Sequence, residues 1–370
     1  MKKNSNLIFT LVIFFISLVL WILPTGFENP ALVKNSLREK AEITKTDNRD
    51  LQKYGLVTTG TQFINMEILT GEFEDSVVSS KNVMMGQMSF DKVYKQGDIV
   101  LAVIEKENSK IKSARAEDIY RINVELILFV LFSLFLVLFA GWTGFKALLS
   151  FVFTALAIWK ILIPFLLKGI APITVTLLIV FITTTVIILL ISGFTKKGTV
   201  ALSGSITGVL ITAALSVIFG YFFRVPGSVK EFSELLLYAG FVDLNLSDIL
   251  ISGIFISAAG AVMDVAMDIS AAQDELIEKS PNLTKRELIL SGFKIARPVI
   301  GTMTTTLLFA YSGSFMFVFM VFMAKGTPAI NIFNINFVAA EILHTMVGSF
   351  GLVLVAPVTA IIGGYVFTKK

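Results

Sequence analysis

Long apolar runs separated by short polar connectors make up most of the chain. A helix of about 20 apolar residues crosses a hydrocarbon core of roughly 30 Å. The runs of this length lie at about residues 7–23, 123–144, 147–167, 172–193, 199–223, 247–267, 298–323 and 336–367. The pattern therefore predicts a polytopic α-helical membrane protein with about eight transmembrane helices.

Residues 28–122 interrupt this pattern with frequent Lys, Glu, Asp, Asn and Ser. A short amphipathic helix is expected at Ala31–Glu42, followed by strands at 56–61, 63–69, 77–78 and 99–104, with a turn at Gln96-Gly97-Asp98 before the last strand. We therefore expect a small mainly-β extracytoplasmic domain, a barrel or a sandwich, between helices 1 and 2. The expected domains are an anchor (1–27), this β-rich domain (28–122) and a seven-helix membrane domain (123–367).

The first apolar run follows Lys2 and Lys3 and ends at Pro24. A cleaved signal peptide would have the same charge pattern, but no Ala-x-Ala cleavage site follows, and Trp21 suits an interfacial anchor. We expect a retained helix. Either alternative places the segment that follows it outside.

The distribution of Lys and Arg predicts the orientation of the membrane domain. Short cytoplasmic segments carry more positive charge than short outer loops. With both termini inside and 28–122 outside, four basic residues fall in short outer loops: Lys168, Arg224, Lys230 and Lys325. Twelve fall inside: Lys2, Lys3, Lys146, Lys196, Lys197, Lys279, Lys285, Arg286, Lys294, Arg297, Lys369 and Lys370.

Two connectors carry helix-start signals. Ser228 with Glu231, and Thr284 with Glu287, match capping boxes. The first predicts an outer helix on the membrane surface. The second, after a break at Ser280-Pro281, predicts a cytoplasmic helical hairpin over 264–297, with Pro298 beginning the next span.

Composition excludes several classes of chemistry. The chain is 55% hydrophobic and 16% charged, has no cysteine and one histidine, and carries a formal charge of +4. Thiolate chemistry and multi-histidine metal sites within one chain are therefore excluded. Because no phosphate-binding loop motif is present, ATP use is not expected. We expect no enzyme activity, no cofactor and no nucleic-acid binding.

Asp264 and Asp268 end a long apolar run and share one helix face. Asp264 lies about 22 Å along the helix from the start of its run, inside the hydrocarbon depth. An acid there is costly unless it is neutralised, paired or hydrated, so we expect a buried cation, proton or substrate site. The alternative is that Asp264 caps or pairs structurally and Asp268 lies at the water boundary.

Glu341 and His344 are three residues apart in the last span, so they are neighbours on a helix. Such a pair can bind a metal or relay a proton, but it also fits a helix end near water. Both alternatives stay open, because the depth of burial decides between them.

Hydroxyl-rich and glycine-rich positions complete the candidate residues. Thr302, Thr305 and Tyr311 of the seventh span could line a hydrated path or bond to their own helix. Pro357 predicts a kink in the last span. The small residues expected to allow close helix packing are Gly204, Gly208, Gly260 and Gly301.

Three blocks of sequence together resemble the YibE/F-like family of bacterial multi-pass membrane proteins: Ala259–Ser270; Gly301–Leu307 with Ala310–Gly313; and Glu341–Leu343 with Val347–Leu354 and Ala356–Thr359. The resemblance covers roughly residues 120–367 and includes Asp264, Thr302 and Glu341. It implies a protein of the bacterial cytoplasmic membrane, of the longer YibE-type arrangement with an outer domain. It also implies assembly with a shorter YibF-type paralogue, or a homo-oligomer, within the lipid bilayer.

Two functions of different classes fit the sequence. The first is a secondary transporter or permease with Asp264 as its cation, proton or substrate site, because intramembrane acids and glycine-interrupted helices are typical of carriers. The alternative is a scaffold or sensor that binds a partner through the outer domain. An intramembrane protease is disfavoured, because Asp264 and Asp268 lie on one helix.

Overall fold

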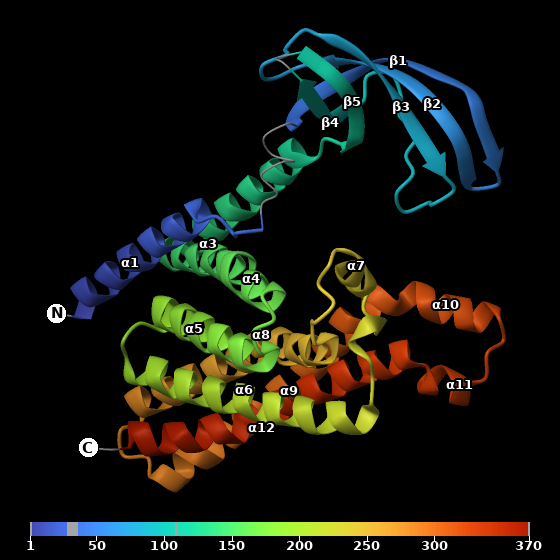
Figure 1. The fold of residues 1–370 in the computed structure, drawn as a ribbon. Coiled ribbons are helices and arrows are strands. Elements are labelled where there is room, and N and C mark those ends of the chain that lie inside the picture. Colours follow the sequence, from blue (N-terminus) through green and yellow to red (C-terminus); the bar gives the residue numbers. More distant parts are fainter. Residues whose placement is uncertain (1, 28–35, 108–109, 369–370) are drawn as a thin grey trace. The chain divides into compact units, whose positions relative to one another are not determined.

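The computed structural model describes residues 2–27, 36–107 and 110–368 (Figure 1). Its chain separates into two compact units, one formed by Gly26–Phe135 and the other by Met1–Thr25 with Leu136–Lys370. We describe each unit by itself. The first is built on a β-sheet and the second on apolar helices.

Five antiparallel strands form one sheet in the order β3-β2-β1-β4-β5. The strands are β1 (Ser36–Tyr54), β2 (Val57–Ile68), β3 (Val77–Met85), β4 (Ile99–Glu107) and β5 (Lys110–Ile119). β1 pairs with β4 through residues 36–42 and with β2 through residues 41–54, with register shifts against β2 at Ile43/Lys45 and Asp47/Asp50. Such bulges bend a strand. The end strands β3 and β5 approach each other, so the sheet curls into a partly open five-stranded barrel.

The barrel encloses a small apolar core with one buried amide. Gln62 is fully buried and donates from Nε2 to Asn48 Oδ1 and to the Tyr94 carbonyl, both at 2.7 Å. Its Oε1 accepts from Tyr94 N at 3.0 Å and from Asn82 Nδ2 at 3.1 Å. Burial is the largest cause that raises the pKa of Tyr94 to about 12. The two hydrogen bonds between Gln62 and the backbone of Tyr94 hold the connection between β3 and β4 against the barrel.

The strands expected at 77–78 and 99–104 are confirmed within β3 and β4, whereas those expected at 56–61 and 63–69 form one continuous strand, β2. The turn at Gly97 is present with φ 88°. The helix expected at Ala31–Glu42 is wrong over residues 36–42, which lie in β1, and residues 31–35 lie outside the described residues. Pairing of Leu37 with Ile104 and of Ala41 with Val100 overrides the local helical pattern. β1 beyond residue 42 and β5 were not predicted. In both stretches, charged residues interrupt the alternation of apolar and polar positions by which a strand is recognised.

Helices make up the second unit (Figure 1). The long apolar ones are α1 (Lys2–Ile22), α3 (Ile122–Ala157, which begins in the first unit), α5 (Pro172–Ser192), α6 (Lys196–Phe223), α8 (Leu246–Lys279), α9 (Lys285–Ser312) and α12 (Asn336–Phe367). The shorter ones are η1 (Ile158–Leu162), α4 (Ile163–Leu167), η2 (Gly227–Val229), α7 (Ser233–Tyr238), η3 (Gly313–Phe315), α10 (Met316–Ala324) and α11 (Ala329–Asn334).

Within the described residues, 6 helices are long and apolar enough to cross a membrane, or up to 7 if the pair α9–α10, bent by 67°, counts as one span. The predicted spans 123–144 and 147–167 both fall in one helical stretch of 46 residues, Ile122–Leu167. Gly141, with φ 55° and ψ −130°, departs from helical geometry inside it. Eight crossings therefore stay a prediction, while the helical, apolar character of the domain is confirmed.

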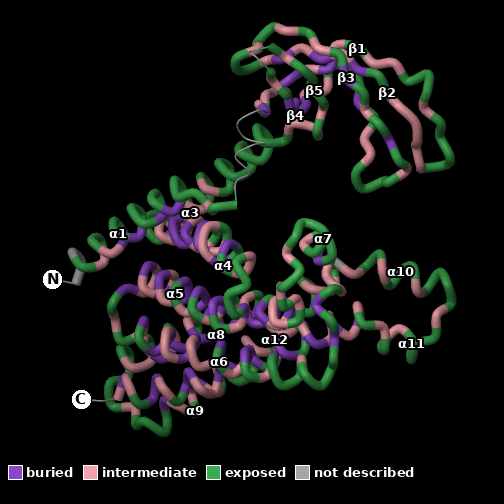
Figure 2. The backbone as a smooth tube through the Cα atoms, in the orientation of Figure 1, coloured by how far each residue is buried: buried purple, intermediate pink, exposed green. Residues whose placement is uncertain are grey.

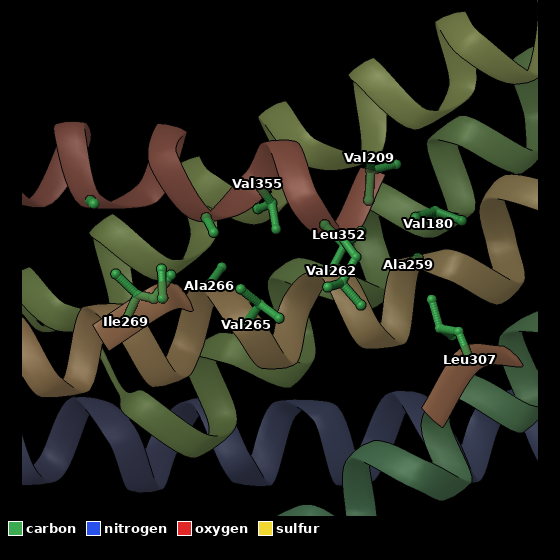
Figure 3. Close-up of a cluster of buried hydrophobic side chains, with 13 residues drawn as sticks. Val180, Val209, Ala259, Val262, Val265, Ala266, Ile269, Leu307, Leu352 and Val355 are labelled. Carbon is green, nitrogen blue, oxygen red and sulfur yellow. The ribbon is translucent and has the colours of Figure 1, made fainter. Parts of the chain in front are cut away.

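Helices α6, α8, α9 and α12 pack around the largest apolar cluster, which includes Val209, Val262, Leu352 and Val355 (Figure 3). Glycines permit this close approach. A Cβ at Gly208 would lie 2.6 Å from Val262 Cγ1 and 2.8 Å from Val355 Cβ. Gly204 similarly faces Thr359, and Gly351 faces Thr212. Buried residues concentrate on α5, α6, α8 and α12, whereas α9 has few and α10 has none among its described residues (Figure 2).

Of the two capping boxes expected from the sequence, one is confirmed and the other is wrong. The capping box of Thr284 and Glu287 is confirmed, and it begins α9 after α8 ends at Lys279. α9 then continues through Pro298 without a break, so the new helix expected at Pro298 is wrong. α12 likewise continues through Pro357.

The capping box expected at Ser228 is also wrong. A 3-10 turn, η2, occupies 227–229, and α7 begins only at Ser233, after Phe232 with φ 62°. Gly227 packs directly against the Leu246 carbonyl at the start of α8. This contact fixes the connector close to the helix bundle.

Replacing Gln62 with Ala should destabilise the barrel by about 1–3 kcal/mol, because buried partners lose their hydrogen bonds. Hydrogen exchange of the full chain should show faster exchange at the amide of Tyr94 and in β2. Gln52→Ala is the control, since the bond that Gln52 accepts from Tyr54 is exposed. Unchanged exchange in Gln62→Ala would contradict the role of Gln62.

Gly208→Ala should lower the stability of the helical unit by about 1–3 kcal/mol, because the new methyl overpacks against Val262 and Val355. Gly260→Ala is the matched control on α8, where an added Cβ meets nothing within 4 Å. Thermal unfolding of the purified protein should show a lower midpoint for Gly208→Ala alone. Equal effects of the two substitutions would refute this account of the packing.

Candidate functional site

One cluster of polar side chains links three helices and a connector of the second unit. Glu341 Oε2 lies 3.2 Å from Lys230 Nζ, and Glu341 Oε1 lies 3.5 Å from His344 Nδ1. His344 Nε2 lies 2.5 Å from Ser257 Oγ. The ring of Tyr311 lies 4.2 Å from that of His344, measured between centroids. These side chains form a continuous polar chain from Lys230 to Ser257.

The fold positions each member differently. Glu341 and His344 are one helical turn apart near the start of α12, and Ser257 lies in the middle part of α8. Tyr311 lies near the end of α9, and Lys230 follows η2 in an irregular connector. The side chains of Glu341 and His344 are only 13% and 15% exposed, whereas that of Lys230 is 43% exposed. The buried carboxylate therefore depends on a cation from a non-helical segment.

The bonds of Ser257 restrict how His344 can be protonated. Ser257 Oγ also lies 2.9 Å from the carbonyls of Gly253 and Ile254. When the hydroxyl proton goes to a carbonyl, His344 Nε2 must donate to Ser257. When the hydroxyl instead donates to His344 Nε2, His344 Nδ1 can donate to Glu341. The bonds of Ser257 therefore leave both tautomers of His344 open, and only the second places a proton between His344 Nδ1 and Glu341 Oε1.

Two cavities border the cluster and share Lys230, Glu231 and His344 as lining residues. One has a volume of about 410 Å³, with Glu341, Tyr311, Phe315, Val318 and Phe337 among its lining residues. The other has a volume of about 370 Å³ and is mainly apolar, with Leu236, Leu246, Ile249, Leu250 and Ile254 among its lining residues. Both are of the size that holds small organic ligands.

Asp264 and Asp268 lie elsewhere on α8. Both are exposed, and neither has a hydrogen bond or ion pair with the part of the chain that the structure describes. They continue the exposed face that carries Ser257 and Gly260, in steps of three or four residues. The expected position of Asp264 at hydrocarbon depth stays a prediction. Among the described residues, no group of three or more acidic or histidine side chains could hold a metal ion.

The hydroxyls expected to line a path bond mainly to their own helix. Thr302 Oγ1 donates to the carbonyl of Val299 at 3.0 Å, and Thr305 Oγ1 lies 3.3 Å from that of Gly301. Both threonines are exposed on α9. Of the three expected pathway residues, only Tyr311 meets the polar cluster. Gly260 and Gly301 face open space within the described residues, in contrast to Gly204 and Gly208.

Three residues of this site were not expected as site residues from the sequence: Lys230, Glu231 and Ser257. Lys230 lies 111 positions from Glu341, and Ser257 lies 87 positions from His344. A motif of neighbouring residues cannot indicate pairs that lie so far apart in the sequence. The available signal was that a Glu341 expected within a span needs a cation, and Lys230 is one of the four basic residues expected in short outer loops.

Comparisons with known proteins identify the family. Neither a curated protein nor a solved structure matches the chain. A family model described as YibE/F-like protein matches residues 128–369, which is more than half of the 370 residues. This stretch contains Glu341, His344, Asp264 and Asp268, and it ends close to the last described residue. The chain therefore belongs to the YibE/F-like family.

Proposed function

We propose that the protein is a secondary permease of the bacterial cytoplasmic membrane, coupled to a proton or another small cation. The observation that carries the proposal is the Lys230–Glu341–His344–Ser257 cluster beside a cavity of about 410 Å³ within an apolar helical domain. Ionisable groups at such positions are costly to maintain, and in membrane proteins they typically belong to substrate or ion pathways.

The exposed face of α8 supplies a second stage of the proposed ion pathway. Ser257 and Asp264 are seven residues apart, about 10 Å along the helix axis, and Asp268 lies one turn further. A cation or proton that leaves the cluster would next meet Asp264 and then Asp268. In the proposed topology, with both termini cytoplasmic, the cluster lies towards the outer side and the aspartates towards the inner side.

The open aspartates also support coupling. Within the described residues neither has an internal cation, so in lipid each needs a proton, a bound cation or water. Glu341, in contrast, is already paired with Lys230. The proposed permease therefore has one carboxylate neutralised by the protein itself and two that take their counter-charge from outside the chain.

Asp264→Asn and Glu341→Gln should each reduce ion-driven charge movement by about tenfold or more, because each loses a charged interaction worth about 1.5–3 kcal/mol. The full chain, reconstituted in liposomes, is exposed to Na⁺, K⁺ or pH gradients, and charge movement is measured by solid-supported membrane electrometry. Glu275→Gln is the control, because Glu275 lies exposed on the same helix with Lys279 as its partner.

No charge movement in the wild-type protein with any gradient, or full movement in Asp264→Asn, would refute the proposed coupling site. Both variants are compared at equal reconstituted amounts, so that loss of folded protein is not mistaken for loss of function.

One observation favours the alternative of a partner-binding scaffold or sensor. Tyr54, Leu56 and Met85 are 64%, 83% and 75% exposed at the tip where β1 turns into β2 and β3 ends. Exposed apolar side chains that gather at one place are typical of an interaction site. A scaffold would bind its partner through this tip.

The absence of native cysteine allows a direct test of the tip. A single cysteine at Leu56, carrying a photoreactive group, should give one adduct of defined mass in intact cells if the tip is a docking site. A cysteine at Lys110, the first residue of β5, is the control. Equal labelling from both positions, or no adduct from Leu56→Cys, would exclude a docking role for the tip.

A further inference from the structure

Lys230 occupies a place in the polar cavity that suits an ammonium ligand. Its Nζ lies 3.2 Å from Glu341 Oε2 and 5.8 Å from the centroid of the Phe315 ring. A carboxylate together with an aromatic face is the usual environment for an organic cation in a protein site. Tyr311 and Phe337 supply further aromatic lining, and Glu231 supplies a second carboxylate.

The side chain of Lys230 is expected to be more mobile than that of its partner Glu341. Glu341 is fixed on α12 and nearly buried, whereas Lys230 is half-exposed and lies in an irregular connector between η2 and α7. Its side chain can therefore withdraw without breaking a helix. Withdrawal would leave Glu341 and Glu231 beside an aromatic cavity with a net negative charge.

The neighbouring apolar cavity indicates the rest of the ligand. It shares Lys230, Glu231 and His344 with the polar cavity and has a volume of about 370 Å³. Its other lining residues are mostly aliphatic, such as Leu246 and Ile249 of α8. A ligand with a cationic head at Glu341 could extend an apolar chain into this space.

We propose that this double cavity binds a primary organic amine with an apolar chain, and that Lys230 is an internal competitor that occupies the head-group position when the ligand is absent. The amine displaces Lys230 Nζ from Glu341 and from the face of Phe315. The assignment of this amine as cargo rests on the proposed permease function, whereas binding can be measured without transport.

The test uses n-hexylammonium as the probe and the full chain in lipid nanodiscs, with binding measured by calorimetry. Lys230→Gln should bind the probe about tenfold more tightly than the wild-type protein, as expected when a competitor that fills about nine-tenths of the sites is removed.

Lys325→Gln, which removes another exposed lysine of the same unit, should leave the affinity unchanged. The double variant Lys230→Gln/Glu341→Gln should bind no probe above the level of n-hexanol, which controls for uptake by lipid. Hexanoate should not bind to any variant.

Equal or weaker binding by Lys230→Gln, or equal binding of n-hexylammonium and n-hexanol, would overturn the proposal. Lys230→Met, which keeps the apolar stem, is the second variant. If neither variant folds, Lys230 is a structural partner of Glu341, and the proposal also fails. Ion-driven charge movement without amine binding would leave the permease intact and remove only the ligand. Amine binding without any charge movement would keep the site and refute the permease.

Discussion

The close contact of α6, α8 and α12 is the constraint on which the rest of the helical unit depends. Gly208 brings α6 against Val262 of α8 and Val355 of α12, so the three helices are in close contact at this position. Apolar burial drives little association between helices in lipid, and close packing of small residues takes its place. Larger side chains at these contacts would separate the helices.

This packing sets the geometry of the polar cluster. α8 and α12 are held side by side, so His344 of α12 reaches Ser257 of α8. Gly348, one turn beyond His344, would place a Cβ 3.6 Å from that of Ala258 and 3.8 Å from Tyr311 Oη. A methyl group at Gly348 would therefore make only ordinary contacts beside Tyr311. The contact of α8 with α12 is what brings His344 to Ser257.

The sequence was informative where local physics decides the structure. Apolar length predicted the long helices, and the capping box at Thr284 predicted the start of α9. Spacing placed Glu341 beside His344, and Asp264 and Asp268 on one face. Periodicity could not tell whether that face points into the protein or away from it, because this depends on which helices lie against α8. The pairing of Lys230 with Glu341 is equally non-local, as is the pairing of β1 with β4 that replaced an expected helix.

The two kinds of carboxylate in this domain have different consequences under the proposed function. Glu341 is neutralised by Lys230, so it can accept an external cation only when that lysine leaves. Asp264 and Asp268 need a counter-charge that no described residue supplies, so their occupancy depends on the surrounding ions and protons. A carrier requires that one site empties as another fills, and it must not leave an unpaired charge in lipid. Under the proposed function, Lys230 beside Glu341 and the open aspartates of α8 meet this requirement with few residues, because Lys230 can neutralise Glu341 whenever the external cation is absent.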